Sequence, residues 1–146
     1  MPLSDRSAQI SALYQEMILD HYRRPRNKGE LAEADETIVM KNPLCGDEIT
    51  VQLKYDGDSV SDIGFSGRGC SISQASASMM TERLMGKSRD EAEAEISHFK
   101  AMMVGEEEFP EMDDLAALKG VIQYPSRIKC ATLAWTAFQQ GLEGRK

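Results

Sequence analysis

The stretch Asn42-Pro43-Leu44-Cys45-Gly46-Asp47 decides how the rest of this chain must be arranged. Its proline disfavours helix at the preceding residue, and its glycine permits a tight turn. The thiol and the carboxylate on either side of that glycine can therefore converge on one point. A thiolate and a carboxylate so placed form half of a tetrahedral metal site. The remaining cysteines, Cys70 and Cys130, would complete four ligands if the fold brought them to this loop.

Composition limits the classes of protein to which the chain can belong. Its 146 residues suit one domain, 1–146, with 41% hydrophobic and 28% charged residues. The net charge of -7, from 24 acidic and 17 basic residues, argues against binding nucleic acid or an anionic membrane. No apolar run approaches the roughly 20 residues of a membrane span. The polar first residues, 1–8, lack the apolar core of a signal peptide, so a soluble cytoplasmic protein is expected.

The three cysteines cannot all pair within one chain. In a reducing compartment, metal binding or thiol chemistry is the better interpretation. The alternative is that some of them are small buried hydrophobic residues, as free cysteines often are.

Hydrophobic periodicity predicts an α+β fold with a small three-stranded antiparallel sheet packed against several helices. A helix is expected over Ser7–Arg24, followed by a polar connector. Strands are expected over 37–40, 49–55 and 60–66, with an Asp-Gly hairpin turn between the last two.

The second half of the chain is predicted to be helical. Helices are expected from Ser71 to about Met85, from the Ser88 capping box to about Met103, over Leu115–Lys119, and from Pro125 until Gly141 ends the run.

Two of the cysteines fall at informative places on these helices. Cys70 would lie at or near the N-cap, where the positive end of the helix dipole stabilises a thiolate. Cys130 would lie in the second turn of the last helix. Arg127 shares its face and would either stabilise a thiolate or pair with Asp47, unless it is a plain surface residue.

Neither histidine is expected to bind a metal. His21 falls in the last turn of the first helix, where an exposed or capping role is favoured over that of a ligand. His98 lies off the apolar face of its helix and is interpreted as a surface residue.

Four motifs occur in an order that resembles the IscU/NifU N-terminal family of iron–sulfur assembly proteins, and its SufU branch in particular. They are Asp20-His-Tyr-Arg-Arg-Pro-Arg-Asn-Lys-Gly29, Asn42-Pro-x-Cys-Gly-Asp47, Gly67-x-Gly-Cys-Ser-Ile-Ser73 and Arg127-x-Lys-Cys-Ala131. Two departures from the IscU pattern match the SufU branch: Lys129 replaces a histidine, and a helical segment is inserted around 88–110.

The resemblance implies an IscU-like fold and a zinc ion held by Cys45, Asp47, Cys70 and Cys130. It implies that the chain accepts persulfide sulfur from a SufS-type cysteine desulfurase on Cys45, stimulates that enzyme and passes sulfur to the SUF scaffold complex. It also implies that Arg127 supports the transfer. Our hypothesis is that a group from the desulfurase replaces Cys45 on the zinc and so frees its thiolate.

Two alternatives remain open at the level of sequence. The chain could be an assembly scaffold that holds a transient [2Fe–2S] cluster, since such clusters prefer thiolate ligands. It could also be a structural zinc domain that activates the desulfurase by docking alone.

Overall fold

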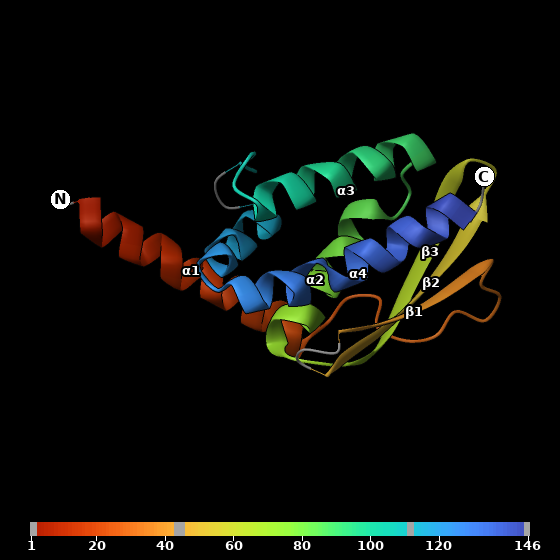
Figure 1. Ribbon diagram of the computed structural model, residues 1–146, viewed down its shortest axis with the longest axis horizontal. Coiled ribbons are helices and arrows are strands. Elements are labelled where there is room, and N and C mark those ends of the chain that lie inside the picture. The colour runs from red at the N-terminus through yellow and green to blue at the C-terminus, as the bar shows by residue number, and fades with distance from the viewer. Residues whose placement is uncertain (1–2, 43–45, 111–112, 145–146) are drawn as a thin grey trace.

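The computed structural model describes residues 3–42, 46–110 and 113–144. Within these residues a three-stranded sheet lies at one end of the molecule and the helices cover it and extend away from it (Figure 1). The helix α1, Leu3–Arg23, projects furthest from the sheet, so the two chain ends lie at opposite ends of the molecule (Figure 1). No helix among the described residues is long and apolar enough to cross a membrane.

The sheet is antiparallel in the order β1-β2-β3, as predicted. Its strands are β1, Glu36–Asn42, β2, Asp47–Asp56, and β3, Ser59–Arg68. The predicted alternation holds in β2, where Ile49, Val51 and Leu53 are fully buried. The register pairs Asn42 with Asp47, so the two described ends of the opening motif face each other across β1 and β2.

The helices follow the predicted order, and their bounds differ from prediction at the ends. They are α2, Ser71–Leu84, α3, Arg89–Met103, the 3₁₀ helix η1, Asp114–Gln123, and α4, Pro125–Gly144. The Ser88 capping box is complete: its hydroxyl accepts from the Glu91 N–H, and the Glu91 carboxylate accepts from the Ser88 N–H.

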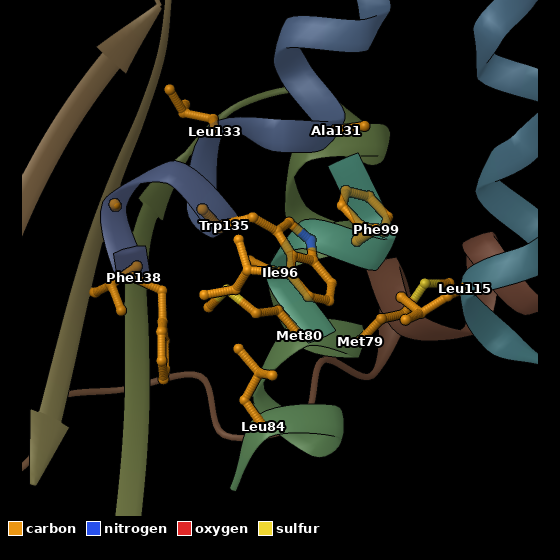
Figure 2. Packing of buried hydrophobic residues seen from close by; sticks show 14 of the residues in the cluster. Met79, Met80, Leu84, Ile96, Phe99, Leu115, Ala131, Leu133, Trp135 and Phe138 are labelled. Atoms are coloured by element: carbon orange, nitrogen blue, oxygen red, sulfur yellow. The ribbon is translucent and has the colours of Figure 1, made fainter. Parts of the chain in front are cut away.

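The core is formed by one face of the sheet together with the helices, and Figure 2 shows the part of it where α2, α3 and α4 meet. Trp135 of α4 stacks on Phe99 of α3 with ring centroids 4.1 Å apart. The indole N–H of Trp135 donates to the Ser76 hydroxyl at 3.0 Å, which satisfies the one polar atom of that ring. Because this core fixes α2 and α4 against each other, it also fixes the cysteines that these helices carry.

The prediction that Gly141 ends the last helix is wrong. Gly141 is buried inside α4, where a Cβ would lie 2.7 Å from Ile38 and 2.8 Å from Leu53. A glycine is needed here because α4 crosses close to the sheet. From the sequence alone, such a packing requirement looks the same as a signal that ends a helix.

Candidate metal centre

The start of β2 brings a buried carboxylate to the end of the sheet. Asp47 is only 2% exposed and pairs in register with Asn42. The Gly46 N–H donates to the Asn42 carbonyl at 2.9 Å, and Gly46 has a φ of 72°. That backbone conformation favours glycine, as expected for a tight turn. Cys45, the predicted sulfur acceptor, lies outside the described residues.

The glycines before Cys70 allow α2 to begin against Asp47. Gly67 has a φ of 123°, and a Cβ there would lie 2.1 Å from the Glu48 carbonyl oxygen. At Gly69 a Cβ would lie 2.6 Å from Asp47 Oδ1. Both positions therefore require glycine for the chain to pass this closely.

Cys70 is the N-cap of α2, as predicted, and its own side chain makes no capping hydrogen bond. Instead its N–H donates to Asp47 Oδ1 at 3.0 Å, and its Sγ lies 3.7 Å from Asp47 Oδ2. The carboxylate thus lies at the positive end of the helix dipole, with the half-buried thiol beside it.

Cys130 comes from α4 and is 1% exposed. Its Sγ lies 3.9 Å from the Ser126 carbonyl oxygen and 4.0 Å from Asn42 Nδ2. Sequence reasoning missed the contact of Asn42 with Cys130, although Asn42 is the first residue of the Asn42–Asp47 motif.

Asp47, Cys70 and Cys130 form a group that we call the cysteine site. One ligand atom from each lies within 4.8 Å of the others. Two sulfurs and a carboxylate oxygen in one small volume are a donor set that zinc accepts. The structure therefore brings together three of the four predicted ligands, and the fourth, Cys45, is two residues from Asp47 in the sequence.

Arg127 is exposed and faces the cysteine site. The pKa of its guanidinium is raised, first by the charge of Cys70 and by a hydrogen bond to it, and then by Cys130 in the same two ways. Stabilising a thiolate would require this position beside the two thiols, and that role of Arg127 stays a prediction.

An open groove leads to this site. Its volume is about 750 Å³, and it runs between α1, the start of α2, η1 and the start of α4. Tyr14, Ile18 and Tyr124 line it, with Cys70 and Arg127 also in its wall. A partner could therefore approach the half-buried thiol without unfolding the domain.

The prediction of an exposed position for His21 is wrong. Its ring is 2% exposed, with Nδ1 2.8 Å from Ser78 Oγ and Nε2 2.8 Å from Asp114 Oδ2. Periodicity placed it correctly in the last turn of α1. Periodicity could not show that α2 and η1 pack over His21, because Ser78 and Asp114 are far from His21 in the sequence.

The fold and the cysteine site belong to one known class of protein. The model of the NifU-like N terminal domain matches residues 13–142, and the chain belongs to this family. The resemblance read from the four motifs is confirmed, as is the IscU-like fold. The chain therefore has a role in iron–sulfur cluster assembly.

Individual relatives are similar over nearly the whole chain. The zinc-dependent sulfurtransferase SufU of Bacillus subtilis is 47% identical, over 93% of each chain. The iron–sulfur cluster assembly scaffold protein IscU of Streptococcus pyogenes is 41% identical, over 93% of this chain and 86% of that protein. The crystal structure of a candidate iron–sulfur cluster assembly scaffold protein for the SUF system, from Fervidobacterium islandicum, superposes with a TM-score of 0.81 at 36% identity. It covers 87% of this chain and 94% of that one.

Proposed function

We propose that this chain is a zinc-dependent sulfur acceptor and transferase. It takes persulfide sulfur from a SufS-type cysteine desulfurase on Cys45, stimulates that enzyme and passes the sulfur to the SUF assembly machinery. The observation that carries the proposal is the convergence of Asp47, Cys70 and Cys130. The SufU relative, which is named a zinc-dependent sulfurtransferase, supports the same activity.

Zinc suits the residues that are present. Cys45, Asp47, Cys70 and Cys130 would hold it, and when bound it would keep the thiols deprotonated at neutral pH. Three thiolates and a carboxylate around a divalent ion leave a net charge of about -2. The guanidinium of Arg127 beside two of these thiols offsets part of that charge. A closed four-ligand site with this negative charge would release one of its thiolates more readily than a neutral site would.

The transfer step is a thiol–disulfide-type exchange. The Cys45 thiolate attacks the terminal sulfur of the desulfurase cysteine persulfide. A new S–S bond forms on Cys45 while the S–S bond of the desulfurase persulfide breaks. The desulfurase cysteine leaves as a thiolate. The terminal sulfur keeps its proton as it moves to Cys45, so no external oxidant or reductant is needed.

Access for the partner comes from the groove beside the cysteine site. It opens on Cys70 and Arg127 and has the tyrosines Tyr14 and Tyr124 in its walls. Tyr124 is 62% exposed, which is high for so large a side chain. An exposed tyrosine beside a reactive site is typical of surfaces that bind another protein.

Mass spectrometry tests the acceptor role. The zinc-loaded chain is mixed with a SufS-type desulfurase and cysteine, and a gain of about 32 Da, one sulfur atom, is expected on the peptide that contains Cys45. In Cys45→Ser the gain disappears and desulfurase turnover falls. Sulfur found only on Cys70 or Cys130, or turnover that stays at the wild-type level in Cys45→Ser, would contradict the proposal.

Aerobic purification separates the transferase from the scaffold alternative. A colourless protein with one zinc per chain is expected. A brown protein with visible absorbance and bound iron would instead support a transient [2Fe–2S] cluster on the same residues.

A further inference from the structure

A second group of metal-binding side chains lies outside the cysteine site. His21, Glu82 and Asp114 each offer one ligand atom within 4.8 Å of the others, and we call them the His21 cluster. They come from α1, α2 and η1 respectively. His21 Nε2 lies 2.8 Å from Asp114 Oδ2 and 3.7 Å from Glu82 Oε1.

The imidazole is oriented by a partner on its other nitrogen. Nδ1 lies 2.8 Å from Ser78 Oγ, and the Arg26 N–H donates to the same hydroxyl at 2.8 Å. A hydroxyl that accepts one hydrogen bond can still donate to Nδ1 or accept from it. Ser78 can therefore hold the ring with the proton on either nitrogen, as outer partners of metal-binding histidines do.

Within the part of the chain that the structure describes, the arginine contact of this cluster is the long one between Arg26 and Glu82. Arg83 is held by Glu95 at 2.9 Å and by Asp113 at 3.0 Å. Arg26 donates to Asp20 at 2.6 Å, and its Nε approaches Glu82 only to 3.9 Å.

The remaining carboxylate charge faces open space. The side chains of Glu82 and Asp114 are 48% and 47% exposed, whereas that of His21 is 3% exposed. Both carboxylates line a cavity of about 300 Å³, which gives water access to the cluster.

A hydrolytic triad of Ser78, His21 and Asp114 is not supported. The Ser78 side chain is fully buried and already engaged with His21 and Arg26, so no substrate could reach its hydroxyl. The exposed oxygens of the cluster are acceptors rather than nucleophiles.

We propose that His21, Glu82 and Asp114 bind a divalent metal ion of the manganese or zinc class, independently of the cysteine site. One imidazole and two carboxylates suit such borderline and hard ions, and waters from the cavity complete the coordination. Nε2 binds the ion through its lone pair, so the single proton of the neutral ring lies on Nδ1 and is donated to Ser78 Oγ, and the ion takes the place of the contact between His21 and Asp114.

Titration with Mn²⁺ tests this site, because Mn²⁺ prefers oxygen and imidazole ligands to thiolates. The loss of the free Mn²⁺ electron paramagnetic resonance signal measures binding. The wild-type chain is expected to bind one ion. Glu82→Gln and Asp114→Asn are expected to weaken binding by roughly tenfold or more, since even outer partners of a metal are worth that much. Both variants retain hydrogen-bonding amides, and Glu82 is half exposed, so the fold is expected to persist.

The controls locate the ion. Glu93→Gln removes an exposed carboxylate that pairs with Arg89 on α3, and it is expected to bind Mn²⁺ as the wild type does. The titration uses the chain loaded with one zinc ion, so that the cysteine site is filled and Mn²⁺ has to bind elsewhere. No binding up to roughly millimolar Mn²⁺, or binding in Glu82→Gln and Asp114→Asn as tight as in the wild type, would overturn the proposal. None of these results bears on sulfur transfer.

Discussion

At the scale of single residues, the cysteine site depends on a missing side chain. A Cβ on Gly69 would lie 2.4 Å from Ser73 Oγ and 2.6 Å from Asp47 Oδ1. Asp47 would have to move, and its 3.0 Å hydrogen bond from the Cys70 N–H would be lost or distorted. A ligand that is displaced in this way binds metal less well, even though its chemistry is unchanged.

Gly69→Ala is therefore expected to lower zinc affinity by about tenfold or more. The matched control is Gly120→Ala, because a Cβ at Gly120 meets nothing within 4 Å. Competition with a chromophoric zinc chelator measures both variants. If the two alanines leave zinc affinity equally unchanged, the close approach of Gly69 to Asp47 has no role in binding.

Residue identity alone could show the cysteine ligands but not the His21 cluster. Cys70 and Cys130 are rare residues with distinctive neighbours, so their chemistry is visible in the sequence. Glu82 and Asp114 are ordinary acidic residues among the 24 of the chain. Only the packing of α2 and η1 against α1 brings these two residues together beside His21.

At the scale of elements, α3 has its own local start signal. The pKa of Glu91 is lowered, first by the hydrogen bond from the Ser88 backbone N–H and then by the Ser88 side chain. A depressed pKa stabilises the fold above the ordinary value of 4.5, and this contribution is lost as the pH falls through the lower, folded-state pKa.

Ser88→Ala is expected to lower stability by about 1 kcal/mol, as loss of an N-cap does. For a chain of this size that is a fall of roughly 2–4 °C in Tm. Thermal unfolding at pH 7 measures it, and an unchanged Tm would show that the cap is dispensable. Glu91→Gln is the control for titration: it keeps an acceptor without the charge, so its deficit against the wild type should shrink at acidic pH.

Helices and strands could be predicted where neighbouring residues determine them. Their bounds were harder to predict where packing against distant residues determines them. The capping box, the hairpin turn and the alternation of β2 depend on neighbouring residues, and the structure has them as expected. Periodicity predicted only Leu115–Lys119 for the helix before α4. The 3₁₀ helix η1 extends over Asp114–Gln123, with five of its apolar residues buried against the rest of the domain.

At the scale of the whole molecule, the cysteine site joins segments that are far apart in sequence. Asp47 begins β2, Cys70 precedes α2, and Cys130 lies on α4. A metal that these residues share would tie the sheet to two of the helices. Structural zinc contributes about 10–16 kcal/mol in zinc-finger peptides, whereas a typical domain has a total stability of about 5–15 kcal/mol.

Removal of zinc is therefore expected to unfold the chain or to make it markedly labile. Without the ion, the buried Asp47 carboxylate and the buried Cys130 thiol lose the divalent charge that would offset their own. Melting curves of the zinc-loaded chain with and without a strong chelator measure the effect, and a large fall in Tm is expected with chelator. Cys130→Ser is the matched control: it lacks one proposed ligand, so it should start with a lower Tm and respond little to chelator. Superimposable curves for the wild type would show that the sheet and helices hold together without a metal.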